Sequence, residues 1–132
     1  KIRLIQLMDA SGGPADAGVN GAPASYAAMA TPAGLRAIAS YAYGIGPNKN
    51  LIWDGKAAPT TLVADAHAVG LRLHPWTFRA ENAFLPAIYR NGADPATHGD
   101  ITAEIQAYLN LGVDGFFTDF ALIGFNARKA AR

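Results

Sequence analysis

The hydrophobic and polar pattern of residues 71–82 (LRLHPWTFRAEN) predicts a strand followed by a polar loop. The apolar side chains alternate with polar or aromatic ones and fall on opposite sides of the strand, Leu71 and Leu73 against Arg72, His74 and Trp76. Pro75 has no backbone N–H for a strand partner, so the strand is expected to end near Trp76. The loop that follows carries Thr77, Arg79, Glu81 and Asn82. Polar loops after strands are where α/β folds place ligand-binding groups, although a buried strand with a solvated loop gives the same pattern.

Three further segments have strand patterns. Residues 2–7 are almost continuously apolar, which is typical of a strand covered on both faces. Residues 45–47 predict a very short strand that ends in a Gly-Pro turn and is followed by Asn48, Lys49 and Asn50. Residues 113–120 (VDGFFTDF) predict the last strand, with Thr118 and Asp119 at its C-terminal end.

The segments between these strands have apolar residues at helical spacing, which predicts helices there. Thr31 and Pro32 are start signals for a helix that is expected to reach about Ala42. Thr60 or Thr61 caps the next helix, and Gly70 ends it. Asp100 caps a third helix that ends at Gly112, and residues 121–132 predict a short helix with a basic end. Residues 10–25 and 77–98 are expected to be long loops.

The alternation of strands and helices predicts an α/β fold with a parallel sheet, because parallel neighbours need a long connection. Four such units are half of an eight-stranded (β/α) barrel, which usually has about 250 residues. An open doubly wound sheet of four strands is the alternative, and no GxGxxG or P-loop pattern supports a nucleotide-binding version. We therefore expect residues 1–132 to be one domain or half of one.

The composition is that of a globular domain and gives no sign of a nucleic-acid-binding or membrane-spanning protein. The chain is 51% hydrophobic and 16% charged, so it can form a core, and its net charge of +1 gives no argument for a nucleic-acid partner. It has no cysteine, and no apolar run reaches the roughly 18 residues of a membrane span. The opening KIRLIQLMD has a strand pattern and does not resemble a signal peptide. Since the chain opens inside a strand, we expect its beginning to be missing.

The residues alone do not form a complete catalytic set. Glu81 and Glu104 are the only glutamates, and Glu104 falls on an ordinary amphipathic helix. With Asp9 and Asp119, Glu81 could supply a carboxylate pair, but no spacing singles one out. The three histidines, His67, His74 and His98, lack the spacing of a zinc site, and there is no GxSxG motif.

The sequence resembles the C-terminal half of the glycerophosphodiester phosphodiesterases, particularly the periplasmic and secreted bacterial type. The run LHPWTFRAEN, followed after an insertion by GVDGFFTDF, carries the resemblance. LIQLMD, YAYGIGPNKNLI, LRLHPWTF and VDGFFTDF would then be the fifth to eighth strands of a TIM barrel.

The resemblance implies hydrolysis of glycerophosphodiesters to glycerol 3-phosphate and an alcohol, with a divalent cation, calcium or magnesium. In the family, the two catalytic histidines, the HRG motif and the metal-binding carboxylates belong to the N-terminal half and have no counterpart in this chain. No catalytic or metal-binding residue is therefore predicted here, and His74 is expected to be structural.

The residues that the resemblance assigns to substrate binding are Trp76, Arg79, Gln6 and Lys49. Trp76 corresponds to an aromatic residue that flanks the glycerol, and a flat ring packs well on a polyol. Arg79 is the candidate for the phosphate, because a guanidinium can form paired charge-assisted bonds. Gln6 and Lys49 are placed by their strand ends, where Lys49 either binds phosphate or faces solvent. Asp119 is expected to fix this rim by hydrogen bonds.

Two functions of different class are open. The chain is either the substrate-binding half of an enzyme, completed by an N-terminal half-barrel, or a non-catalytic half-barrel that self-associates or only binds a polyol or phosphate. A half-barrel has open sheet edges and exposed apolar positions, so it is expected to pair with a second copy. The resemblance favours a periplasmic or secreted location without fixing it.

Overall fold

The computed structural model describes residues 2–19, 23 and 25–131. Within them, three strands form one parallel sheet in the order β1 (Ile5–Met8), β2 (Gly44–Pro47) and β3 (Arg72–Leu73). Ile45 of β2 is in register with Gln6 on one side and with Leu73 on the other. The structure confirms the α/β class and the parallel sheet. It gives three strands where four were predicted.

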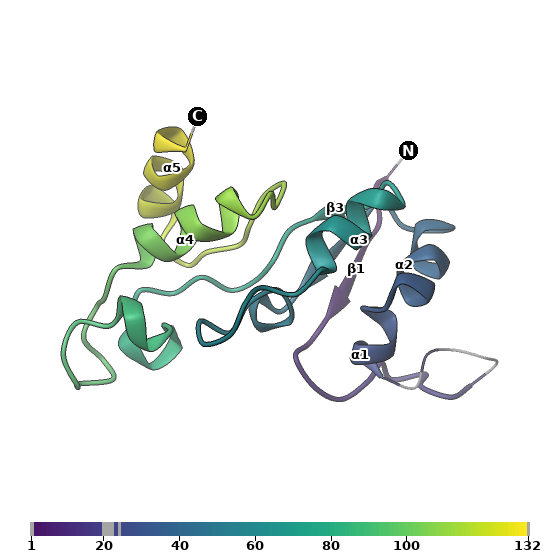
Figure 1. Cartoon of the computed structure of the whole chain (residues 1–132), viewed down its shortest axis with the longest axis horizontal. Coiled ribbons are helices and arrows are strands. Elements are labelled where there is room, and N and C mark those ends of the chain that lie inside the picture. The colour runs from purple at the N-terminus through teal and green to yellow at the C-terminus, as the bar shows by residue number, and fades with distance from the viewer. Residues whose placement is uncertain (1, 20–22, 24, 132) are drawn as a thin grey trace.

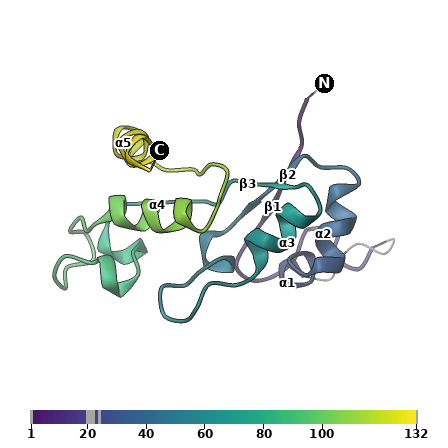
Figure 2. The same cartoon turned by 45° about the horizontal axis from the view of Figure 1, so that its top comes forward.

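In the described part of the chain, five α-helices connect and flank the strands: α1 (Tyr26–Met29), α2 (Pro32–Ala39), α3 (Leu62–Ala68), α4 (Ile101–Asn110) and α5 (Ala121–Ala130). Three single 3₁₀ turns are also present, at Lys49–Leu51, Asn82–Phe84 and Ala87–Tyr89. Figure 1 shows the strands with α1 to α3 at one end of an elongated chain, and α4 and α5 at the other. Figure 2 gives the same division from a second direction.

Most helix boundaries follow the predicted caps. The Thr31 hydroxyl accepts a hydrogen bond from Gly34 N at 3.2 Å, and the Asp100 carboxylate accepts one from Ala103 N at 2.9 Å. Gly70 adopts a positive φ of 80°, which ends the turn after α3. Helix α2 ends at Ala39, three residues earlier than predicted, and α1 was not predicted. The loop predicted at 10–25 contains no helix or strand where the structure describes it, whereas residues 20–22 and 24 lie outside that part.

The hydrophobic core lies on one face of the sheet. Met8, Ile45 and Leu73 are fully buried there, and they pack in one cluster with apolar residues of two helices, Leu35 and Ile38 of α2 and Leu62, Val63 and Ala66 of α3. Leu71 is buried with them, whereas Arg72 is exposed. The two sides predicted for the strand at 71–76 are therefore confirmed.

The prediction that the first strand is covered on both faces is wrong. Ile2, Leu4 and Leu7 are 88%, 56% and 57% exposed, and only Met8 of β1 is buried. The helices cover the face that carries Met8, so the alternate side chains of β1 point to the other face. Of these side chains, Leu7 is exposed and Ile5 is half-buried, whereas Ile2 and Leu4 precede β1.

The predicted strand at 113–120 is also wrong as a regular strand. The segment runs beside the chain after β3, with a single parallel bridge between Phe78 and Thr118. Backbone bonds from Gly115 N to Leu73 O at 3.2 Å and from Phe117 N to Pro75 O at 2.9 Å hold it there. Since Pro75 has no N–H to return a bond, the ladder remains incomplete. The strand predicted at 71–76 is shortened to Arg72–Leu73 plus a bridge at Trp76, and on the β2 side the gap falls where Pro47 has no N–H for the His74 carbonyl.

Helix α4 packs on the chain that leaves β2 and β3. Tyr108 is buried, and its ring meets Phe78 edge-on with 4.9 Å between ring centroids. Its hydroxyl donates to the carbonyls of Trp53 at 2.5 Å and Lys49 at 3.1 Å. Tyr108 therefore joins α4 to the turn after β2.

Candidate functional site

The chain segments after β2 and β3 meet at the carboxyl ends of these strands. Asn48 and Trp76 form a parallel bridge, and Lys49 N donates to Trp76 O at 2.9 Å. Parallel strands present their carboxyl ends at one edge of the sheet, which explains why two loops so far apart in sequence come together. They enclose an open pocket of about 390 Å³, lined by Asn48, Lys49, Asn50, Trp76, Thr77, Arg79, Ala83 and Phe84.

Three of the four predicted substrate-binding residues line this pocket: Lys49, Trp76 and Arg79. The fourth, Gln6, does not line it. Its Oε1 accepts a hydrogen bond from the Tyr41 hydroxyl at 2.8 Å, and its Nε2 donates to Leu7 O at 2.9 Å. Gln6 shares the sheet face of Ile45, with which it is in register, so its side chain points toward the helices.

Trp76 is fixed by its own indole. Nε1 donates to the Gly46 carbonyl at 2.7 Å, and the residue is partly buried. Trp76 also borders a second, more apolar pocket of about 480 Å³, together with Leu7, Thr77, Phe117, Thr118 and Asp119. The ring therefore stands between two hollows and is held by a backbone bond, as an aromatic platform for a ligand would be.

Arg79 is held by carboxylates and by an aromatic ring. Its Nη2 and Nε atoms donate to the two oxygens of Glu81 at 2.8 and 3.3 Å, and Nε lies 3.5 Å from Asp119 Oδ2. The guanidinium carbon lies 4.3 Å from the centre of the Phe84 ring. The hydrogen bond from Arg79 lowers the pKa of the Glu81 carboxyl, so this pair is charged at neutral pH.

Lys49 is buried, with only 6% of its surface exposed. The alternative that it faces solvent is therefore wrong. Its ammonium bonds Glu104 of α4 at 2.6 Å and the Phe84 carbonyl at 2.9 Å. Glu104 falls on an amphipathic helix, as expected, but it lies on the buried face of that helix and is fully buried.

Two residues of the site were missed in the sequence, Phe84 and Glu104. Glu104 lies three residues after Ile101 and four before Tyr108, which are both buried on α4. This spacing places the three side chains on one face of the helix, so it was a usable signal for a buried carboxylate. Phe84 lies in a 3₁₀ turn inside the predicted loop, and we find no local pattern that could have identified it.

The residues present do not fit a metal ion. Among the described residues, no group of three or more His, Asp or Glu side chains comes together as a metal site would require. The carboxylates of Glu81 and Asp119 are both engaged by Arg79, and that of Glu104 is engaged by Lys49. Asp9, at the end of β1, accepts hydrogen bonds from Ala10 N and from Asn48 Nδ2. We therefore derive no step of a reaction through a metal from these residues.

Neither His74 nor His67 lines the pocket. His74 is partly buried, and its ring packs so closely on Gly115 that a Cβ there would stand 2.8 Å from it. His67 Nε2 lies 2.9 Å from Asp114 Oδ2, at the opposite end of the sheet from the pocket. The structural role predicted for His74 agrees with this packing and stays a prediction.

The parallel sheet and the polar pocket at its strand ends place the chain in the class of α/β domains that have a pocket at the carboxyl ends of their strands. Residues 5–123 match the glycerophosphoryl diester phosphodiesterase family. A relative is the glycerophosphodiester phosphodiesterase GDPD6 of Arabidopsis thaliana, which is 40% identical over 101 residues. The match covers 73% of this chain and 25% of the relative, so the chain spans about a quarter of that protein.

The chain belongs to the glycerophosphoryl diester phosphodiesterase family, as the resemblance predicted. The family has the TIM-barrel type of fold. The periplasmic and secreted bacterial type stays a prediction, since the relative above is a plant protein. Among the described residues no helix has the length and apolar character needed to cross a membrane.

Proposed function

We propose that the chain is the C-terminal part of a glycerophosphodiester phosphodiesterase and forms the substrate-binding rim of its barrel. In this proposal it supplies about four βα units of an eight-stranded barrel. The observation that carries the proposal is the pocket at the strand ends, where Trp76 stands beside two cationic side chains, Lys49 and Arg79. A glycerophosphodiester offers both groups that such a pocket suits, a phosphate anion and a polyol.

The chemistry of each side chain indicates which part of the substrate it would bind. Trp76, held by the Gly46 carbonyl, offers a flat face to the C–H surface of glycerol. Lys49 and Arg79 offer charge-assisted N–H donors to the phosphate oxygens. The acid, the base and the divalent cation, calcium or magnesium, would come from an N-terminal half-barrel in the same or another chain. The products would be glycerol 3-phosphate and the free alcohol.

Complementation tests this proposal. The 132-residue chain is mixed with the N-terminal half-barrel of a family member, and glycerol 3-phosphate released from glycerophosphocholine is measured by a coupled assay. We expect turnover in the mixture that a chelator abolishes and calcium or magnesium restores. The Trp76→Ala and Arg79→Gln variants should lower it by about tenfold or more, because each removes a direct substrate contact. Arg128→Gln, which alters an exposed arginine of α5, is the matched control.

Turnover by the chain alone would show that no N-terminal half is needed. No turnover in a mixture that is shown to associate would refute the proposed activity. Equal turnover of Arg79→Gln and Arg128→Gln would refute the role of the pocket.

A second candidate is a non-catalytic half-barrel that pairs with itself, and the exposed apolar side chains favour it. Leu7, Phe117, Leu122 and Phe125 are between 54% and 73% exposed. Native mass spectrometry, compared with the denatured mass of 13.8 kDa, separates the two functions. A stable dilute monomer would count against self-association, whereas a dimer that binds glycerol 3-phosphate without turnover would support it.

A further inference from the structure

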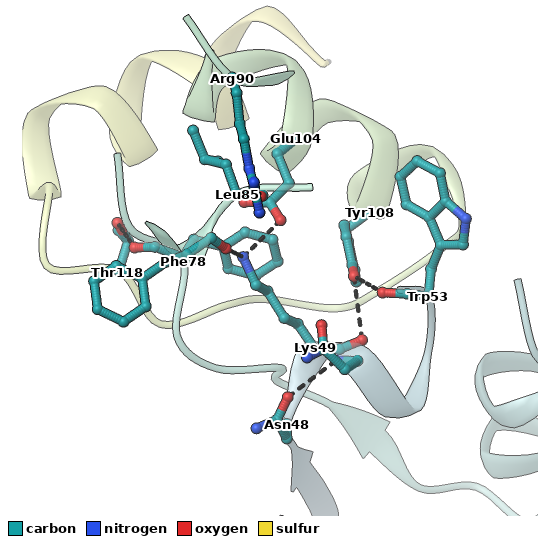
Figure 3. A network of polar contacts seen from close by, with 11 residues as sticks. Asn48, Lys49, Trp53, Phe78, Leu85, Arg90, Glu104, Tyr108 and Thr118 are labelled. Carbon is teal, nitrogen blue, oxygen red and sulfur yellow. Dashed lines mark hydrogen bonds and ion pairs between the residues drawn. The ribbon is translucent and has the colours of Figure 1, made fainter. Parts of the chain in front are cut away.

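The buried ion pair between Lys49 and Glu104 connects the pocket with helix α4. Lys49 Nζ lies 2.6 Å from Glu104 Oε1, and the two side chains are 8% and 0% exposed. Figure 3 shows the Lys49 side chain reaching from the turn after β2 to Glu104 on the helix above it. Burying a charge is costly unless an opposite charge lies beside it. Separating the two side chains would leave both charges buried without a partner, so the geometry of the pair is strongly fixed.

The Lys49 ammonium has one N–H donor without a hydrogen-bond partner among the described residues. An ammonium has three N–H groups, of which Glu104 and the Phe84 carbonyl occupy two. Lys49 lines the pocket, and its ammonium also lies 5.3 Å from the centre of the buried Phe78 ring, so the third donor remains for that ring or for an acceptor in the pocket. Arg79 is placed over the ring of the same Phe84, so one residue orients both cations of the site.

Packing alone does not account for a carboxylate at position 104. Its neighbours on the buried face of α4 are Ile101, Ile105 and Tyr108. Glu104 Oε2 is buried and has no hydrogen-bond partner among the described residues. Burial raises the pKa of the Glu104 carboxyl, and Lys49 opposes this rise. A leucine at position 104 would pack against these apolar neighbours without the cost of burying a charge. The carboxylate is therefore explained by its ion pair with the Lys49 ammonium.

We propose that Glu104 is a positioning residue that holds the Lys49 ammonium charged and in place as a phosphate ligand at the base of the pocket. The inference rests on the proposed function, because it takes the pocket as the site of the substrate phosphate. A donor fixed before binding has no rotamer freedom left to lose when the anion arrives. Glu104 acts only through Lys49 and does not touch the substrate.

A double variant separates anion binding from stability. Replacing both buried charges by apolar groups of similar size usually leaves stability unchanged or raises it, so Lys49→Met with Glu104→Leu should fold. The probe is sulfate, which keeps its charge from pH 6 to 9, and the readout is the amide NMR shifts of Asn50 and Thr77, two pocket residues. We expect the double variant to bind sulfate about tenfold or more weakly than the unaltered chain. Lys56→Met, which removes an exposed lysine, is the matched control.

A pH profile tests the action of Glu104 through Lys49. Glu104→Gln keeps an acceptor oxygen but removes the negative charge, and a buried ammonium without a counter-charge loses its proton more readily. The sulfate affinity of Glu104→Gln should therefore fall as pH rises from 6 to 9, while that of the unaltered chain stays level. A purely structural role of Glu104 would not produce this slope.

The other charged or titratable groups near the pair do not produce that slope. Burial raises the pKa of the Tyr89 and Tyr108 phenols, which therefore stay neutral over this range. Arg79 and the carboxylate of Glu81 keep their charges, and Arg90, whose Nε donates to the Leu85 carbonyl, is the same in both proteins. His98, whose backbone pairs with Glu81, is present in both proteins, so the unaltered chain is its control.

Three results would overturn the inference: no saturable sulfate shift in the unaltered chain, equal affinity in the folded double variant, or a level pH profile for Glu104→Gln. Failure of the proposed function would look different. The sulfate results would then hold while the complemented barrel shows no phosphodiesterase turnover.

Discussion

Removing the hydroxyl of Tyr108 should measure how strongly α4 is joined to the pocket. The hydroxyl donates to Trp53 O at 2.5 Å and to Lys49 O at 3.1 Å, and only 1% of the residue is exposed. Tyr108→Phe keeps the ring, so the edge-on contact with Phe78 and the tilted contact with Trp53 remain. The substitution therefore isolates the hydrogen bonds.

The size of the effect depends on which carbonyl loses its only partner. Lys49 O also accepts from Ile52 N at 3.0 Å and from Trp53 N at 3.1 Å, so it stays satisfied. Trp53 O has no other donor among the described residues. One lost hydrogen bond with one partly buried carbonyl left unpaired costs about 1–3 kcal/mol of unfolding free energy.

Urea unfolding followed by circular dichroism measures this difference. We expect Tyr108→Phe to lower the midpoint at an unchanged slope, because the surface exposed on unfolding is the same. Tyr89→Phe is the matched control, since no hydrogen bond of the Tyr89 hydroxyl is found within the described residues. A loss for Tyr108→Phe below about 0.5 kcal/mol, or equal to that of the control, would refute the role of this hydroxyl.

Three further predictions concern acid stability, packing and association. Burial tends to raise the pKa of Asp114, but hydrogen bonds from His67, Leu73 N and Arg72 outweigh burial and lower the pKa. The ionised carboxylate therefore stabilises the folded chain above the ordinary carboxyl pKa, and this stabilisation is lost as pH falls through the lowered pKa. The stability gap between the unaltered chain and Asp114→Asn should therefore shrink between pH 7 and pH 3 in urea titrations, and a constant gap would contradict this. Gly99→Ala should cost about 1–3 kcal/mol, because a Cβ would meet the Tyr89 carbonyl, whereas Gly99→Ala with an unaltered melting temperature would disprove the close approach. Leu7→Gln with Phe117→Ser should weaken any self-association seen by sedimentation, since it removes two exposed apolar side chains of the second pocket; an unchanged dimer would place the interface elsewhere.

Local signals in the sequence were sufficient for much of the fold. Thr31 and Asp100 cap their helices as predicted, because a cap depends on residues only three positions apart. The alternation at 71–76 correctly assigned Leu71 and Leu73 to the core. The resemblance assigned Trp76 and Arg79 to substrate binding, and their positions at strand ends added Lys49 and Gln6; of these four residues, the pocket brings together all but Gln6.

What the sequence did not reveal depended on partners distant along the chain. The apolar run of residues 2–7 predicts a strand covered on both faces, yet Ile2, Leu4 and Leu7 are more than half exposed. The segment 113–120 has strand-forming residues, but its neighbour contains Pro75, which cannot complete the ladder. Lys49 and Glu104 are 55 positions apart, so neither side chain could be identified as buried without the other.

The central strand β2 has consequences for how the chain tolerates mutation. Its sequence is Gly-Ile-Gly-Pro, and all four residues are buried although only Ile45 carries a large side chain. A Cβ on Gly44 would stand 2.5 Å from Arg72 O, and one on Gly46 would stand 2.7 Å from a Leu7 methyl carbon. The two neighbouring strands thus occupy the space that side chains would need. In a library of random variants, Gly44 should therefore be depleted of nearly every substitution, whereas at Gly46 the exposed Leu7 side chain can move aside.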